Sequence, residues 1–227
     1  AFNAIHVLGL GVAGLRKDGG TAPITDQDKF HLGSCTKAMT ATLVARLVEQ
    51  GLMDFDGTLA EAFPDVKVHV DLQTVTIREL LRHEGGVYSE IIEQAPDLWA
   101  TLWDAGSENI EATRRAFAET VLTTQPPHQP GGYHYSNTGY ILVGAVVEDV
   151  LGTSWEQALI TEVFEPFGMA GCGFGAPGDP EGEDQPWGHR SKNGKTQSFP
   201  PGPQGDNPPA LGPAGTVHCP LESWASF

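Results

Sequence analysis

The chain has 227 residues, of which 40% are hydrophobic and 19% are charged, and its formal net charge at pH 7 is −16. This composition is typical of a globular protein, and such an acidic chain is a poor partner for nucleic acid or an anionic membrane surface. There is no apolar run long enough to span a membrane and no signal peptide at the N-terminus. We therefore expect a soluble protein, periplasmic or secreted if a leader was removed and otherwise cytoplasmic.

The first predicted elements in chain order are two strands and a long helix. Residues 6–16 are apolar and glycine-rich, and a turn at 17–20 separates them from a second short strand at 21–25. The helix runs over 34–50 and ends at Gly51, a residue that readily adopts the left-handed conformation after a helix. Its apolar residues lie on nearly every side, so we expect it in the middle of the protein.

Shorter helices and a long loop make up the rest of the prediction. Thr76 and Glu79 form a capping box that begins a short helix. Apolar periodicity predicts three more helices, at 110–122, 137–151 and 155–164. Residues 176–213 are rich in Gly, Pro, Asp and Gln without periodicity, so we expect an irregular loop of the kind that often lines functional sites.

Ser34 and Lys37 stand where a strand-like segment meets the long helix. A serine in the first turn lies at the positive end of the helix dipole, which favours an alkoxide or an oxyanion. Lys37 lies one turn further on the same face, and its amine can take the serine proton if burial lowers its pKa. The pair is a candidate nucleophile, although Ser-x-x-Lys also arises by chance. Cys35 points to another side of the helix, and we expect a buried structural thiol there.

Tyr135 and Asn137 form a second constellation, just before the helix at 137–151. One residue separates them, so in an extended or turn conformation both point to the same side. A phenol near a lysine ammonium can act as a base, and an amide can both donate to and accept from a substrate. The alternative is a packing tyrosine beside an asparagine that only caps the helix. Together with Ser34 and Lys37, we favour the catalytic interpretation.

The remaining candidate residues are weaker. His134 and Trp187 are possible pocket residues, although packing explains either of them as well. The three cysteines contain no Cys-x-x-Cys pair, so we expect neither a disulfide framework nor a zinc site. His-Glu-x-x-His is also missing from the sequence. We expect no metal and no organic cofactor.

Five segments occur in the order and spacing of a known superfamily: 33–37 (Gly-Ser-Cys-Thr-Lys), 80–86, 130–140 (with Tyr-Ser-Asn), 164–169 and 213–217. From about residue 7 to its end, the chain resembles the serine beta-lactamase and penicillin-binding-protein-like hydrolases. The similarity is to the branch that holds class C beta-lactamases, D,D-peptidases and related esterases.

The resemblance implies an α+β fold of the beta-lactamase/transpeptidase type, with an antiparallel sheet flanked by helices and a mostly helical region. Residues 1–50 would begin the α/β region with the nucleophile helix, 51–175 would form the helical region, and 176–227 would form active-site loops that return to the sheet. Ser34 would be the nucleophile and Lys37 its activating amine. Tyr135 would be the general base and acid, and Asn137 would bind a substrate amide.

The implied reaction is acyl transfer through an acyl-serine, followed by hydrolysis. An ester, a D-amino-acid amide or peptide, and a β-lactam are all possible substrates, and we favour esterase or peptidase activity over dedicated antibiotic hydrolysis. The alternatives are a penicillin-binding sensor that acylates without turnover and a non-catalytic scaffold of the same fold.

The sequence departs from the superfamily at its third motif, Lys-Thr-Gly or His-x-Gly on a strand, which would follow the segment 213–217. Lys195 and Thr196 are a poor substitute, because no glycine follows them and they precede that segment. We therefore expect the remainder of a longer chain, or a second subunit, to complete the sheet and supply the second oxyanion-hole donor.

Overall fold

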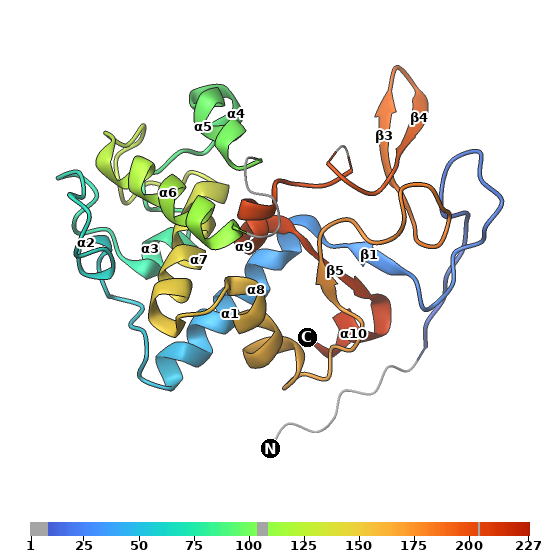
Figure 1. Cartoon of the computed structure of the whole chain (residues 1–227), viewed down its shortest axis with the longest axis horizontal. Coiled ribbons are helices and arrows are strands. Elements are labelled where there is room, and N and C mark those ends of the chain that lie inside the picture. The colour runs from blue at the N-terminus through green and yellow to red at the C-terminus, as the bar shows by residue number, and fades with distance from the viewer. Residues whose placement is uncertain (1–8, 104–108, 204) are drawn as a thin grey trace.

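The computed structural model describes residues 9–103, 109–203 and 205–227. Helices gather around α1 (Thr36–Glu49) and α7 (Asn137–Leu151), and short strands lie beside the N-terminal end of α1 (Figure 1). The other α-helices are α2 (Leu59–Ala62), α3 (Ile77–Leu81), α4 (Ile91–Gln94), α5 (Pro96–Thr101), α6 (Ile110–Thr123), α8 (Trp155–Leu159), α9 (Gly212–Gly215) and α10 (Leu221–Ser226). The remaining elements are the 3-10 helices η1 (Gly33–Cys35) and η3 (Pro209–Leu211), the π-helix η2 (Ile160–Phe164), and the strands β1 (Lys29–His31), β2 (Gly173–Phe174), β3 (Gly188–Lys192), β4 (Lys195–Phe199) and β5 (Val217–Pro220).

The predicted helices are confirmed, and their ends follow from local sequence. The Thr76 and Glu79 side chains each accept from the other's backbone N–H, as a capping box requires. α7 begins after Ser136, whose Oγ accepts the N–H of Gly139, and ends at Gly152 with φ of 64°. The helix predicted at 155–164 is α-helical to 159 and then widens to a π-helix. Over the described ranges, none of the helices has the length and apolar character needed to cross a membrane.

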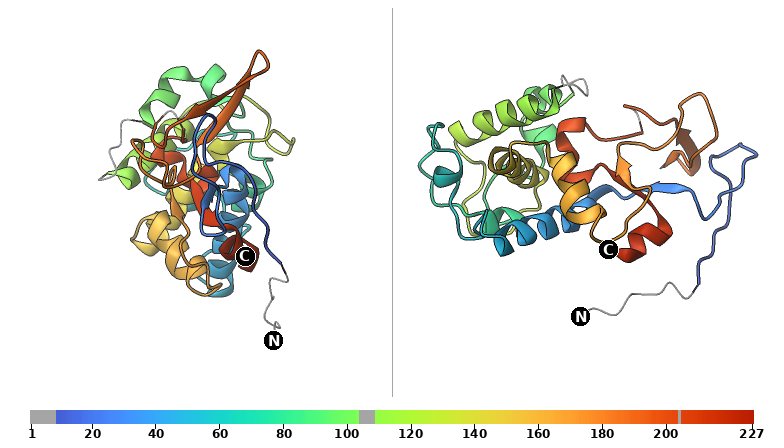
Figure 2. Two further views of the ribbon diagram at one scale, coloured as in Figure 1. Left: turned by 90° about the vertical axis from the view of Figure 1, so that its right-hand side faces the viewer. Right: turned by 60° about the horizontal axis from the view of Figure 1, so that its bottom comes forward.

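The main sheet is antiparallel, in the order β1-β5-β2 (Figure 2), so the predicted α+β fold is confirmed. β5 comes from near the end of the chain and pairs with β1, with Phe30 opposite Cys219. Because β1 leads directly into η1 and α1, this pairing brings the residues just before β5 next to the start of α1. The backbone N–H of Leu32 donates to the carbonyl of Val217 at 2.8 Å and continues the contact beyond the strand.

The prediction of two strands near the N-terminus is wrong for residues 9–25, the part of it that the structure describes. Residues 6–8 lie outside the described residues, and 9–16 and 21–25 form only an isolated bridge between Leu15 and Pro23. The predicted turn does form, with the N–H of Gly20 donating to the carbonyl of Lys17 at 3.1 Å. Side chains rather than a ladder hold the segment, because Arg16 forms a bidentate ion pair with the buried Asp28.

The expected irregular loop at 176–213 contains a hairpin, so that prediction is wrong in part. β3 and β4 pair along five residues each, and the hairpin projects from the body of the molecule (Figures 1 and 2). Asn193 and Gly194 form its turn, with φ of 53° and 72°. Asn-Gly is the preferred sequence for a two-residue hairpin turn, because both residues tolerate positive φ.

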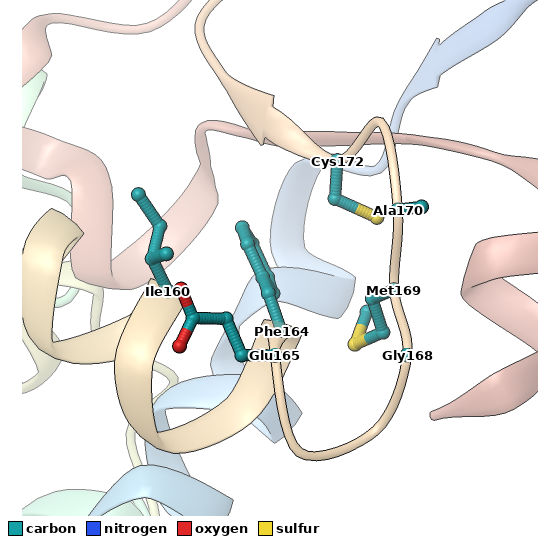
Figure 3. Close-up of a pocket in the computed structure, with 7 residues that line it drawn as sticks. All are labelled: Ile160, Phe164, Glu165, Gly168, Met169, Ala170 and Cys172. Atoms are coloured by element: carbon teal, nitrogen blue, oxygen red, sulfur yellow. The ribbon is translucent and has the colours of Figure 1, made fainter.

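The cysteines also differ from expectation. Cys172 and Cys219 form a disulfide, which ties the segment before β2 to β5. Cys35 is free and exposed rather than buried, because it lies in η1 ahead of the packed part of α1. The disulfide borders an apolar cavity of about 440 Å³ (Figure 3), between η2 and the turn at 168–172. None of the residues that line this cavity belongs to the Ser-Lys pair or to the Tyr-x-Asn segment.

A buried ionic cluster joins α6, α7 and α8 to η3. Arg114 is fully buried, and its Nε donates to the carbonyl of Ala210 at 3.1 Å. The guanidinium also pairs with Glu148, and with Glu156 at 2.8 Å. A buried cation with this many partners fixes the backbone that it contacts, and here that backbone leads into α9.

We expect Arg114→Met to lower the free energy of unfolding by about 3–5 kcal/mol, because it leaves two carboxylates without their buried partner. Arg115→Met is the matched control on the same helix. Arg115 pairs with exposed or partly exposed carboxylates, so its loss is expected to lower the free energy by about 1 kcal/mol or less. Urea denaturation measures both, and equal losses in the two variants would contradict the assignment.

Candidate active site

Ser34 lies in η1, between the end of β1 and the first turn of α1. It is exposed, whereas most of the helix behind it is buried. Gly33 has φ of 51°, a left-handed conformation that glycine adopts without strain, and this turns the chain from strand to helix. The N–H of Cys35 donates to the carbonyl of Leu32 at 3.1 Å, whereas the N–H of Ser34, at the start of the turn, has no acceptor within the helix and lies at its positive end. The Ser34 hydroxyl is therefore presented to solvent in an electropositive backbone environment.

Lys37 is the buried partner of this serine. Its side chain lies in the first turn of α1 and the residue is only 6% exposed. The Nζ lies 3.1 Å from Ser34 Oγ and donates to Asn137 Oδ1 at 2.7 Å. It also donates to the backbone carbonyl of Ala214 at 2.8 Å. Three parts of the chain that are far apart in sequence therefore meet at one amine.

Burial lowers the pKa of Lys37 from its usual value, and Tyr135 acts in the opposite direction. Desolvation penalises the charged ammonium more than the neutral amine. The amine also lies near two aromatic rings, 4.9 Å from the ring centroid of Tyr135 and 5.5 Å from that of Tyr140. The surroundings of Lys37 thus make its deprotonation easier than in water.

Tyr135 and Asn137 reach Lys37 from the same loop. Ser136 caps α7, so Asn137 is the first residue of the helix and its side chain is free to meet the amine. The alternative in which Asn137 is the cap is therefore wrong. Tyr135 is 42% exposed and presents its ring to Lys37 while bordering solvent. Both side chains converge on the amine.

The segment from η3 to β5 contributes backbone groups that the sequence alone did not single out. Besides Ala214, the carbonyl of Pro213 accepts from the Thr40 hydroxyl at 2.7 Å. The N–H of Val217 donates to Thr36 Oγ1 at 3.1 Å. Two threonines of α1 thus hold this segment against the helix. The resemblance of 213–217 to a segment near the active site was the only available signal, and it did not identify a lysine acceptor.

The two weaker pocket candidates lie differently. The His134 ring stacks on that of His128 at 3.8 Å between centroids, next to Tyr135 in sequence. Trp187 lies on the far side of β1, where it lines a cavity of about 170 Å³ and has Lys17 Nζ 4.2 Å from its ring centroid. Trp187 has no hydrogen bond or ring contact with Lys37 within the described residues.

A cavity of about 260 Å³ adjoins the nucleophile turn at Gly33. His31 closes one side, where its Nε2 lies 2.7 Å from Asp206 Oδ1. The cavity is polar and mixed in charge, and its other main lining residues are Arg190, Phe199 and Asn207. Across the described residues, no three His, Cys, Asp or Glu side chains are arranged to hold a metal ion. The cavity reaches Gly33, the residue next to Ser34, so part of a substrate held by Ser34 could lie in it.

Comparisons with known proteins agree on one family. The sequence pattern of the Beta-lactamase family matches residues 5–226. Penicillin-binding protein 4 of Amycolatopsis lactamdurans is 32% identical over 171 residues, which are 73% of this chain and 40% of that protein. Esterase EstB of Burkholderia gladioli is 29% identical over 160 residues, 67% of this chain and 40% of that protein.

A solved structure shows the same arrangement of elements. The penicillin binding protein from Bacillus halodurans superposes with a TM-score of 0.65 and 25% sequence identity, covering 94% of this chain and 63% of that one. The chain thus spans less than two thirds of the length of the relatives described here.

The buried amine predicts a pH-dependent difference in stability. Because burial lowers the pKa of Lys37 when folded, unfolding takes up a proton between that pKa and 10.5. Raising the pH through this window stabilises the wild type relative to Lys37→Met, by up to about 1.4 kcal/mol per pH unit. Urea denaturation across the pH range measures the difference. Lys67→Met, at an exposed lysine, is the control, and its free energy of unfolding should follow the wild-type dependence on pH. A Lys37→Met curve parallel to that of wild type would contradict the account.

Proposed function

Because the chain belongs to the beta-lactamase family, we propose that it is a serine hydrolase in which Ser34 forms an acyl-enzyme. Penicillin-binding proteins and an esterase are among the relatives, which supports this reaction class. Ser34 Oγ attacks the carbonyl carbon of the substrate, and its proton passes to Lys37. Collapse of the tetrahedral intermediate expels the leaving group, and water then hydrolyses the acyl-serine.

The observation that carries this proposal is the set of three partners around Lys37 Nζ. A neutral amine has two N–H donors and one lone pair. Asn137 Oδ1 and the carbonyl of Ala214 are pure acceptors here, and they take both donors. The lone pair is then left for the third partner, Ser34 Oγ at 3.1 Å. This arrangement suits a lysine that removes the serine proton.

Tyr135 and the turn at Ser34 supply the remaining steps. Tyr135 borders solvent beside Lys37, so it is placed to hand a proton to the leaving group and later to activate water. The backbone N–H of Ser34 is one donor to the oxyanion, because the first turn leaves it without an acceptor in the helix. Asn137 holds the lysine and orients a substrate amide. The protein groups used in these steps are side chains and one backbone N–H, and water is the second reactant.

The substrate class follows from the site less directly. An ester, a D-amino-acid amide or peptide, and a β-lactam all present a carbonyl to the same four side chains. The cavity beside Gly33 is open and polar, which suits a range of acyl or leaving groups. We propose esterase or peptidase activity ahead of dedicated hydrolysis of β-lactams.

Intact-protein mass spectrometry after incubation with p-nitrophenyl acetate, and separately with benzylpenicillin, tests the nucleophile. We expect an acyl increment in wild type that is lost in Ser34→Ala. Cys35→Ala is the matched control, because the neighbouring thiol is exposed and could itself be acylated. It should retain the increment. An adduct that survives Ser34→Ala and disappears in Cys35→Ala would overturn the proposal.

The same assay tests the role of the lysine. We expect Lys37→Met to slow acylation by about 10²–10⁴-fold, the usual contribution of a general base. The rate at which the adduct decays in wild type separates a hydrolase from a sensor that remains acylated. Acylation of Lys37→Met at the wild-type rate would remove the lysine from the mechanism.

A further inference from the structure

His83 occupies an unusual backbone position directly below the Tyr-x-Asn loop. It follows α3 with φ of 62°, a left-handed conformation that is uncommon outside glycine, although histidine adopts it more readily than most residues. Strained positions of this kind persist where the surrounding structure determines them, and they cluster at functional sites. The contacts of His83 give the reason for the conformation.

His83 accepts two hydrogen bonds, one from each residue that flanks Tyr135. The backbone carbonyl of His83 accepts the N–H of His134 at 2.8 Å. The ring Nδ1 accepts the N–H of Ser136 at 3.0 Å. The residues immediately before and after Tyr135 are therefore both tied to His83, and the left-handed backbone allows the carbonyl and the ring to face the same loop.

The imidazole ring also packs against the aromatic side chains of the site. Its centroid lies 4.4 Å from that of Tyr135 and 5.4 Å from that of Tyr140. Tyr140 is fixed in turn, because its hydroxyl donates to the carbonyl of Leu81 at 2.9 Å. The Tyr135 ring is 42% exposed, and His83 is the closest aromatic ring to it among the ring pairs of the described residues.

We propose that His83 is a positioning residue that holds Tyr135 and Asn137 against Lys37, and that it does so only as a neutral imidazole. The neutral ring with its proton on Nε2 can accept the Ser136 N–H at Nδ1. A protonated ring carries a hydrogen on Nδ1, so two donors would face each other and the loop would be released. This inference rests on the proposed function, since it assigns His83 a part in the same site.

The surroundings of His83 favour the neutral form. Burial is the largest cause that lowers the pKa of His83, and the charge of Lys37 lowers it further. The bond from the Ser136 N–H also favours the neutral ring, because it needs an unprotonated Nδ1. The other titratable groups facing the ring are the phenols of Tyr135 and Tyr140, with Tyr133 at 5.9 Å between centroids. The nearest carboxylate in sequence, Glu84, pairs with Arg82 instead. The pKa of His83 is therefore lowered from its usual value of 6.5.

The chain allows a matched set of variants. His83→Asn keeps a side-chain acceptor and tolerates positive φ, but it loses the ring and the titration. His83→Ala loses all of these. His69→Asn is the control, because that histidine contacts Asp71 and Leu122 and is not among the candidate site residues. The measured quantities are the acylation rate constant with p-nitrophenyl acetate as a function of pH, and the Tm of each variant.

We expect His83→Ala to acylate roughly 100-fold more slowly, as a misplaced catalytic group does. His83→Asn should recover to within roughly tenfold of wild type, the remaining loss being the ring contact. Below pH 6.5 the logarithm of the wild-type acylation rate constant should fall with a slope against pH that is one unit greater than that of His83→Asn, because wild type takes up one more proton at His83. His69→Asn should match wild type. Equal rates and equal acid slopes in wild type and His83→Asn would overturn the proposal, as would a loss in His83→Ala that His83→Asn does not recover.

A second measurement needs no substrate. Nitrogen-15 NMR of histidine-labelled wild type should show Nδ1 of His83 unprotonated, and a loss of protection of the Ser136 amide as His83 titrates. If wild type forms no acyl adduct but these signals are found, the proposed function fails and the positioning inference stands. A protonated Nδ1 at neutral pH would overturn the inference whatever the acylation assay shows. If His83→Ala does not fold, the comparison of the acid slopes of wild type and His83→Asn tests the inference without it.

Discussion

The buried amine of Lys37 needs hydrogen-bond partners because water does not reach it freely, and three parts of the chain supply them. Ser34 comes from the junction of β1 and α1, Asn137 from the start of α7, and the Ala214 carbonyl from α9. The β1–β5 pairing returns the segment 217–220 to the start of α1, and Arg114 fixes the backbone that leads into α9. The fold thus brings these partners to one point, and the lowered pKa of Lys37 is a consequence of that enclosure.

Much of this arrangement could be predicted from sequence, because it depends on local signals. The capping box at Thr76, the glycines after the long helices and the apolar periodicity all act within a few residues. The positions of Ser34 and Lys37 in one helical turn follow from the period of the helix. Tyr135 and Asn137 could be placed near each other because one residue separates them. The superfamily resemblance then predicted the fold.

The features that were missed depend on contacts between distant segments or on small local details. A backbone carbonyl such as that of Ala214 leaves no trace in residue type, so its bond to Lys37 could not be seen. Cys172 and Cys219 are 47 residues apart, and nothing in their spacing predicts that the sheet brings them together. The two strands expected at the N-terminus form only an isolated bridge between Leu15 and Pro23, and the pairing of Arg16 with Asp28 beside it could not be read from the apolar pattern. The hairpin at Asn193 was different, since its turn signal was present and was overlooked.

The central claim is that enclosure by the fold turns Lys37 into a base for Ser34, and its titration is the most direct test. The chain has six lysines, so carbon-13 labelling of their ε-carbons gives few enough NMR signals to assign by substitution. The account predicts that the Lys37 signal titrates below 10.5, and that Asn137→Ala, which opens the enclosure to water, moves that titration back towards the usual value. A Lys37 that titrates at the usual value in wild type would contradict the account, because the amine would then be charged when it is needed as a base.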